Sequence, residues 1–311
     1  MIIRNYLNIF ILIFFFSINV NSLKAEIFIK AKVNNQIITN LDIQDEKNYL
    51  IALNPKLKDL SKDEIFRYSI DSIINERIKK IEIEKNFEII ENENVIDKII
   101  KNLYLNLNIN NLENFKLYLK NFNVNISQVR KKITIEVAWN DLIVKKFNNS
   151  IFVDTDKIKK KIDDQDSSNF VRNLSLSEII FTIKDDESFS EKYDKIKSSI
   201  TSIGFNETAR IYSLADSKND GGNIGWVYRK QLSDKIIKEV DKLSIGEFSK
   251  PITTSGGFIL IKLNDFKDEN IKVNKEELFS KAIDFEKNRQ LNRYSTIFYK
   301  RIYNSAIINE F

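Results

Sequence analysis

The sequence predicts an α+β protein in which a glycine-rich α/β module is inserted into a largely helical domain. All seven glycines of the 311-residue chain lie between Gly204 and Gly257, and glycine supplies the positive φ angles of tight turns and bulges. The sequence on both sides of this stretch has long apolar periodicities of the helical kind. We therefore expect the module at residues 170–268, between residues 26–165 and 269–311 of one helical domain.

Composition limits the chemistry that the chain can perform. Hydrophobic residues make up 42% and charged residues 30% of the chain, with 49 Lys and Arg against 44 Asp and Glu. Because histidine and cysteine are absent, disulfides, thiol nucleophiles, His-based triads and Cys/His metal sites are excluded. Lys and Glu are interleaved, which indicates a mixed solvated surface rather than a nucleic-acid-binding face. We expect no metal, no cofactor and no nucleic-acid partner.

The first 25 residues have the features of a secretory signal peptide. Arg4 supplies a positive charge, residues 9–16 form an unbroken apolar run, and Ser22 or Ala25 is a small residue suited to cleavage. The alternative is an uncleaved membrane anchor. A membrane span needs about 20 apolar residues, however, and this stretch is shorter and interrupted by polar residues. The sequence thus predicts export, with no membrane span left after cleavage.

Local signals predict a β-hairpin followed by helices in residues 26–165. Residues 27–33 and 36–38 have strand-like patterns on either side of a turn. Three residue pairs have the spacing of a helix capping box: Thr39 with Asp42, Ser61 with Glu64, and Asn125 with Gln128. The first two boxes predict helices that reach about residue 53 and at least residue 81. Further helices are expected at 94–106, 112–121, 128–147 and, after Asp154, to about 162.

The module and the C-terminal segment have different patterns. Residues 163–169 are polar and are expected to form a linker. In the module we expect a strand at 174–183, a helix at 187–203, a short helix at 232–243 and a strand at 257–264. Asn274 with Glu277 predicts the start of a final long helix with an apolar stripe. Such a helix cannot bury its stripe alone, so it is expected to pack on the N-terminal helices, where Trp139 is interpreted as a core anchor.

Four short blocks in the module resemble the parvulin-type peptidyl-prolyl isomerases. These blocks are Ser177-Glu178-Ile179-Ile180, Gly221-Gly222-Asn223-Ile224-Gly225-Trp226, Gly246-Glu247-Phe248-Ser249-Lys250-Pro251 and Gly256-Gly257-Phe258-Ile259-Leu260. Each glycine pair alone is weakly specific, but the four blocks occur in the family's order and spacing. The flanks, including residues 31–43, Ala138-Trp139 and Ala306-Ile307, resemble SurA-like periplasmic chaperones.

The resemblance implies a fold and a function. It implies an antiparallel sheet of at most five strands with flanking helices, the FKBP-like α/β arrangement of parvulins, beside a helical chaperone core. It also implies a periplasmic chaperone or foldase that binds unfolded or nascent outer-membrane polypeptides, with weak or degenerate prolyl isomerase activity. The alternatives are an active peptidyl-prolyl cis-trans isomerase and, if the N-terminus is uncleaved, a membrane-tethered foldase.

The resemblance also points to site residues, because parvulin sites usually contain two histidines, a nearby Cys or Asp, and an apolar proline pocket. Glu178 stands at the first histidine position and Ile259 at the second, and the Cys/Asp position falls at Ala215 or Asp216. The candidate catalytic residues are thus Glu178 and Asp216. The candidate substrate-binding residues are Leu232, Ile236, Phe258, Ile259 and Trp226. Gly225-Trp226 is expected in a loop that approaches the sheet, with the indole covering it.

Less specific interpretations of these residues remain open. Glu178 could equally be a carboxylate at a strand edge that faces water or pairs with a lysine, and Leu232 and Ile236 could be ordinary core residues. Loss of the histidines need not abolish activity, because prolyl isomerisation breaks no covalent bond. The enzyme has only to lower a rotational barrier of about 18–20 kcal/mol. Desolvation of the amide and stabilisation of its twisted form contribute to that without a nucleophile.

Overall fold

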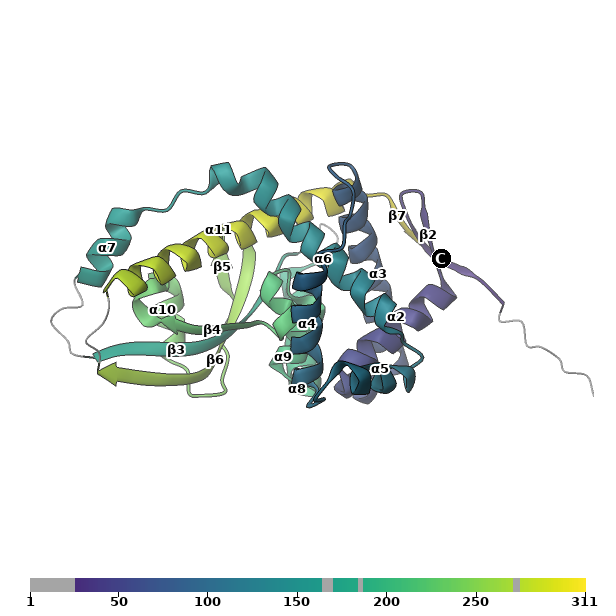
Figure 1. The fold of residues 1–311 in the computed structure, drawn as a ribbon, viewed down its shortest axis with the longest axis horizontal. Coiled ribbons are helices and arrows are strands. Elements are labelled where there is room, and N and C mark those ends of the chain that lie inside the picture. The colour runs from purple at the N-terminus through teal and green to yellow at the C-terminus, as the bar shows by residue number, and fades with distance from the viewer. Residues whose placement is uncertain (1–25, 164–169, 184–186, 271–274) are drawn as a thin grey trace, which may run out of the picture.

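The computed structural model describes residues 26–163, 170–183, 187–270 and 275–311 (Figure 1). The predicted signal peptide and most of the predicted linker lie outside these residues. Within them, no helix is both long enough and apolar enough to cross a membrane. The fold is helical at both ends of the chain, with an inserted α/β module, as the sequence predicts.

The N-terminal elements follow the local signals of the sequence. They are β1 (Ile29–Val33), β2 (Gln36–Thr39), α2 (Asn40–Leu53), η1 (Pro55–Asp59), α3 (Lys62–Glu84), α4 (Glu93–Asn106), α5 (Leu112–Lys120), α6 (Ile126–Phe147), η2 (Asn148–Ser150) and α7 (Thr155–Asp163). All three predicted capping boxes are present, at α2, α3 and α6. Asp154 accepts a hydrogen bond from the backbone N–H of Lys157 at the start of α7, so this predicted cap is confirmed as well.

The C-terminal helix α11 (Lys275–Ser305) packs on α3 and α6 through its second half. Trp139 of α6 is 1% exposed, stacks on Phe298 of α11 with ring centroids 5.6 Å apart, and donates a hydrogen bond from Nε1 to Ser295 Oγ at 3.0 Å. The interpretation of Trp139 as a core anchor is therefore confirmed. A short strand that the sequence analysis missed, β7 (Ile308–Glu310), then pairs antiparallel with β1.

The module contains one antiparallel sheet with the strand order β4-β3-β6-β5. Its elements are β3 (Phe170–Phe181), α8 (Phe189–Ile203), α9 (Phe205–Tyr212), η3 (Asp216–Asp220), β4 (Asn223–Tyr228), η4 (Arg229–Gln231), α10 (Asp234–Val240), β5 (Ile252–Thr254) and β6 (Gly257–Asn270). The prediction that Gly225-Trp226 form a loop is wrong, since both residues belong to β4. Gly225 has φ +74° and lies next to a register shift between β3 and β4. A glycine at such a bulge resembles a turn signal in the sequence, so the strand is not recognised.

The two faces of this sheet carry separate apolar clusters. One cluster joins Ile179, Phe181 and Leu260 of the sheet to α8 and α9. The other, which we call the α10-side cluster, joins sheet residues to Leu232 and α10; its buried members are Leu174, Leu176, Val227, Leu232, Val240, Ile252, Ile259, Ile261 and Leu263. Helix α11 runs past the module on its way to the helical region, with α7 beside its first turns (Figure 1).

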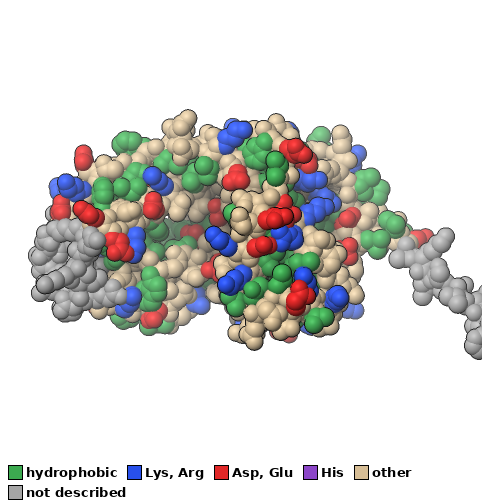
Figure 2. Space-filling model, viewed as in Figure 1, with side chains coloured by type: hydrophobic (Ala, Val, Ile, Leu, Met, Phe, Trp, Pro, Cys, Tyr) green, Lys and Arg blue, Asp and Glu red, His purple; other side chains and the backbone are tan. Residues whose placement is uncertain are grey.

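The outer surface mixes charge and hydrophobicity. Figure 2 shows acidic, basic and hydrophobic side chains scattered over the visible face, and a hollow between the part that contains the module and the helical part. This agrees with the mixed surface that the sequence predicts. The hollow between the two parts is a candidate site.

Candidate functional site

Glu178 lies near the C-terminal end of β3, on the same side of the sheet as the α10-side cluster. Its cross-strand partner on β6 is Ile261, which belongs to that cluster. The residue is only 7% exposed, and its backbone N–H donates to the carbonyl of Gly222 at 2.7 Å. One interpretation left open by the sequence is that Glu178 is a strand-edge carboxylate that faces water. That interpretation is wrong, because the side chain is buried.

The glycine block before β4 allows the chain to approach Glu178 closely. A Cβ atom at Gly222 would lie 2.3 Å from the Glu178 carbonyl oxygen, and Gly222 has φ +79°. Any side chain at Gly222 would thus clash with β3 and strain the backbone. This close approach brings Ser217, in the preceding η3 turn, within hydrogen-bonding distance of Glu178, where its hydroxyl donates to Oε1 at 3.0 Å.

The Glu178 carboxyl is held near its titration midpoint at neutral pH. Burial raises its pKa from 4.5 to about 7; the hydrogen bond from Ser217 opposes this, and the nearby Asp216 carboxyl adds to it. Burial raises the pKa of Asp216 as well. A substantial fraction of Glu178 is therefore protonated at neutral pH, and a protonated carboxyl can donate a hydrogen bond to a substrate, as a neutral histidine can.

The structure brings together only part of the predicted substrate-binding set. Leu232, Ile236 and Ile259 meet in the α10-side cluster, on the face that carries Glu178. Phe258 belongs to the opposite face, where its ring packs against Phe181 and against Phe189 of α8.

Trp226 also lies apart from the α10-side cluster. Its neighbour Val227 is a buried member of that cluster, and side chains alternate along a strand, so Trp226 points to the other face. Trp226 is 49% exposed, with the Lys267 ammonium 4.7 Å from its ring centroid.

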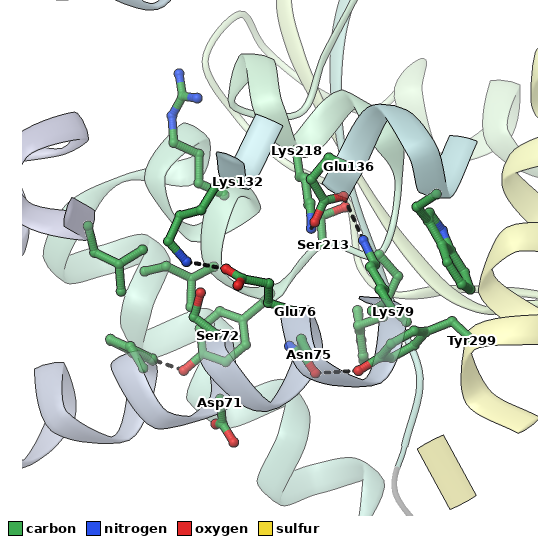
Figure 3. Close-up of a pocket in the computed structure, with 18 of the residues that line it drawn as sticks. Asp71, Ser72, Asn75, Glu76, Lys79, Lys132, Glu136, Ser213, Lys218 and Tyr299 are labelled. Carbon is green, nitrogen blue, oxygen red and sulfur yellow. Dashed lines mark hydrogen bonds and ion pairs between the residues drawn. The ribbon is translucent and has the colours of Figure 1, made fainter. Parts of the chain in front are cut away.

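A second candidate site, which the sequence analysis missed, is a cavity of about 300 Å3 between the module and the helical region (Figure 3). Helices α3 and α6 line it with ion pairs one helical turn apart. Lys79 Nζ lies 2.6 Å from Glu136 Oε2, and Lys218 of the module reaches Glu136 Oε1 at 3.3 Å. Lys132 pairs with Glu46 and with Glu76. The only sequence signal for this cavity is charged residues that interrupt the apolar stripes of both helices.

The charges of this cavity are strongly coupled. Burial alone would raise the pKa of Glu136, but Lys218 and Lys79 outweigh it and lower the pKa to about 2. Burial lowers the pKa of Lys79 to about 8, against the opposing effect of Glu136. Glu136 is thus a permanently ionised link between the module and α6. Among the residues that the structure describes, no group of three or more acidic side chains could hold a metal ion.

Tyrosine hydroxyls complete the contact between the two parts of the molecule. Tyr212 at the end of α9 donates to the hydroxyl of Tyr68 in α3 at 2.9 Å, and the two rings meet edge to face. Tyr299 of α11 donates to Asn75 of α3 (Figure 3). The cavity is thus bounded by the module, the N-terminal helices and α11 together.

Comparisons with known proteins agree with the geometry of the module. Residues 174–265 match the family model described as Rotamase: PPIC-type PPIASE domain. The chain is 31% identical over 80 residues to Chaperone SurA of Cupriavidus metallidurans, which covers 26% of this chain and 16% of the relative. It is 23% identical over 171 residues to Chaperone SurA of Pectobacterium atrosepticum, which covers 52% of this chain and 39% of the relative.

Solved structures give a similar result over a longer stretch. A structure described for PEB4 and the periplasmic protein Cj1289, two SurA-like chaperones of Campylobacter jejuni, matches 91% of this chain and 98% of its own, at 15% identity and a TM-score of 0.35. The matched regions span less than half the length of the curated relatives described above. Residues 174–265 are a PPIC-type parvulin domain, and the chain that carries it is SurA-like.

Proposed function

We propose that this protein is a periplasmic chaperone and foldase that binds unfolded polypeptides, outer-membrane proteins among them, and that its parvulin domain is a weak prolyl isomerase. The proposal is supported by the match of residues 174–265 to the PPIC-type domain, together with the resemblance that assigns Glu178 and Ile259 to the two histidine positions. The sheet and its apolar face are intact, but only one of the two positions can form a side-chain hydrogen bond.

Holding an unfolded chain needs surfaces rather than a nucleophile. The cavity between the module and the helical region offers such a surface, because it combines aromatic rings with charged groups and hydroxyls. These groups can meet both the side chains and the backbone of an extended segment. The similarity to proteins named Chaperone SurA supports the same proposal.

Weak isomerisation is the activity that the α10-side cluster supports. Leu232, Ile236 and Ile259 form a water-poor surface on which a proline ring can pack, and a desolvated amide rotates more easily. The protonated form of Glu178 can add one hydrogen bond at this face. We expect turnover to decline above pH 7, as the carboxyl becomes ionised.

Two assays on the full chain test the proposal. The first follows cis-trans isomerisation of an X-Pro peptide by coupled proteolysis; the uncatalysed reaction takes about 10–100 s, so weak catalysis is measurable. The second follows suppression of porin aggregation. We expect clear suppression and slow but measurable isomerisation. A rate close to that of histidine-containing parvulins would instead identify the protein as primarily an enzyme.

A substitution at the α10-side cluster separates the two activities. Ile236→Asp places a charge on the apolar face and is expected to reduce isomerisation to background while porin protection persists. Ile245→Asp is the matched control, because Ile245 is an exposed residue of the same module. Isomerase activity that survives Ile236→Asp would contradict the assignment of this face.

We also propose that residues 1–25 are a signal peptide that is removed after Ser22 or Ala25. Arg4 and the short apolar run support this. N-terminal sequencing of the exported protein tests it. Recovery of an intact N-terminus that resists carbonate extraction would favour a membrane-tethered foldase.

A further inference from the structure

The α10-side cluster has no aromatic wall of its own. Leu232 is a buried member of this cluster, 2% exposed, and Ile236 is partly buried and packs against the cluster. Helix α10, Asp234–Val240, contains no aromatic residue. A proline ring on this surface would therefore have aliphatic contacts on one side only, unless another part of the chain supplied the opposite wall.

Helix α11 brings an aromatic ring to this place. Leu278, Ala282 and Phe285 follow one another at helical spacing and share a face. Leu278 and Ala282 pack on Ile162 of α7. Phe285 packs against the α10-side cluster, which contains Leu232 and Ile236.

A cavity of about 350 Å3 lies where these elements meet, large enough for a small ligand. Its apolar and aromatic lining comes from both parts of the molecule: Tyr228 and Leu232 from the module, Phe152 and α7 residues Ile158 and Ile162, and Leu278, Ala282 and Phe285 from α11. Gln231 and Ser233 border the cavity and carry groups that can bond to a peptide backbone. Charged residues of both parts, among them Lys161, Asp234 and Arg289, also line the cavity, so it combines apolar walls with polar and charged groups.

The cavity adjoins the sheet face that carries Glu178. Ile261, the cross-strand partner of Glu178, belongs to the same cluster as Leu232. Glu178 therefore lies on the same side of the sheet as the cluster to which Leu232 and Phe285 belong. A peptide whose proline enters the cavity would extend along the face on which Glu178 lies.

The position of α11 is fixed by contacts that do not involve the module. Gln290 Nε2 donates to the carbonyl of Phe152 at 2.6 Å, and the Phe152 N–H donates to Gln290 Oε1 at 3.1 Å. Glu286 accepts hydrogen bonds from Arg289 and from Gln290. Phe285 is thus held on a scaffold anchored to the segment before α7, so its ring can act as a fixed wall.

We propose that Phe285 completes the proline-binding pocket, so that the site is shared between the parvulin domain and the C-terminal helix. Its ligand is an X-Pro segment of an extended polypeptide, with the proline ring between Leu232 and Phe285. The proposal rests on the proposed function, since it names a residue that determines proline specificity at that site.

Proline-dependent binding to the full chain tests this without relying on turnover. The probe is a short Ala-Ala-Pro-Phe peptide, compared with the same peptide carrying alanine in place of proline, and its affinity is measured by NMR titration. Phe285→Ala should weaken binding of the proline peptide at least tenfold, and Phe285→Tyr should restore it. Phe189→Ala is the matched control, because Phe189 packs against Phe258 on the opposite side of the sheet and does not line the cavity, so it should change affinity less than twofold.

A second variant guards against loss of folding. Ala282→Trp keeps Phe285 but fills the cavity from the same helix face, and it should abolish the proline preference while the thermal melt stays cooperative. Unchanged binding in both Phe285→Ala and Ala282→Trp overturns the proposal. Faster isomerisation by Phe285→Ala also overturns it, since the ring would then cover the pocket instead of forming part of it.

Failure of the proposed function gives a different result. If the wild-type chain binds the proline peptide in a Phe285-dependent manner without accelerating isomerisation, that result supports the shared pocket and contradicts the isomerase function. If the wild type and Phe285→Ala catalyse isomerisation equally well, the shared pocket is contradicted and the isomerase function is supported. No proline preference in the wild type overturns the shared pocket as well.

Discussion

Glu178 of the module is buried and Glu136 of α6 is partly buried, yet their pKa values move in opposite directions. Glu136 receives two lysines, Lys79 and Lys218, and its pKa falls to about 2. Glu178 accepts one hydrogen bond, from the Ser217 hydroxyl, and has the Asp216 carboxyl nearby. The effect of burial outweighs that hydrogen bond, so the pKa of Glu178 rises to about 7. Burial is therefore common to both sites, and the number of cationic partners decides the outcome.

The difference separates a structural charge from a candidate functional one. A carboxylate with two lysine partners stays ionised at all ordinary pH values and links two parts of the chain. A carboxyl held near its midpoint can gain or lose a proton at neutral pH, a property that is frequent at functional sites. On this criterion we assign Glu136 to the interface between the module and the helical region, and Glu178 to the proposed isomerase face.

The largest expected effect comes from removing the element that both parts share. Deletion of residues 270–311 takes away β7 and the Phe298 ring that stacks on Trp139. We expect the N-terminal helices to lose cooperative unfolding, as measured by circular dichroism during heating. Replacing residues 170–268 by a short linker should leave those helices folded. An unchanged melt after the C-terminal deletion would contradict the domain division that we propose, with residues 26–165 and 269–311 as one domain.

The next effect tests Glu136 as a structural charge. Glu136→Gln leaves Lys79, a buried lysine, without its closest carboxylate partner. Breaking one side of such a pair costs about 3 kcal/mol or more of the free energy of unfolding, measured by urea denaturation. The control is Glu113→Gln, which breaks an exposed pair with Lys116 and should match the wild type. Equal stability of the two variants would show that the buried cluster is dispensable.

The smallest of the three effects concerns Glu178 and depends on pH. Its pKa of about 7 in the folded chain lies above the ordinary value of 4.5, so it contributes stability below pH 4.5 that is lost as the pH rises through 7. From pH 5 to pH 8 this group should lower the free energy of unfolding by roughly 2–3 kcal/mol. Glu178→Gln should remove that loss, as urea denaturation at both pH values would show.

The Glu136 variant provides the contrast for this pH series. Glu136 does not titrate between pH 5 and pH 8, but without it the pKa of Lys79 falls below about 8, so Glu136→Gln should be destabilised more at pH 5 than at pH 8. If Glu178→Gln instead kept the full pH dependence of the wild type, Glu178 would be in contact with water and would not be the carboxyl that titrates near pH 7.

The elements that depend on neighbouring residues were predictable from the sequence. Thr39, Ser61 and Asn125 each cap a helix together with a residue three positions later; the first two helices begin where expected, and the third begins at Ile126, slightly before the expected residue 128. The four sequence blocks shared with parvulins likewise predicted the module, and the comparison with the PPIC-type family model agrees with them. In contrast, β7 is a three-residue strand and has no periodicity that could be recognised.

The candidate site was only partly predictable because side-chain direction depends on sheet packing. Phe258 and Ile259 are adjacent and must face opposite sides of β6, but only the packing of α8, α9 and α10 shows which side each one takes. The same holds for Trp226 and Val227 of β4. The shared motif blocks located these residues correctly along the chain without indicating that Phe258 and Trp226 lie away from Glu178.

The sequence by itself determined the absence of histidine and cysteine chemistry, the helix starts, and the position of the parvulin domain along the chain. These features depend on composition or on residues a few positions apart. Only the tertiary structure decided that Glu178 is buried beside Ser217 and that Phe285 lies against Leu232. Burial and long-range contacts arise when segments distant in sequence pack together, and both the pKa of a carboxyl and the walls of a pocket depend on that packing.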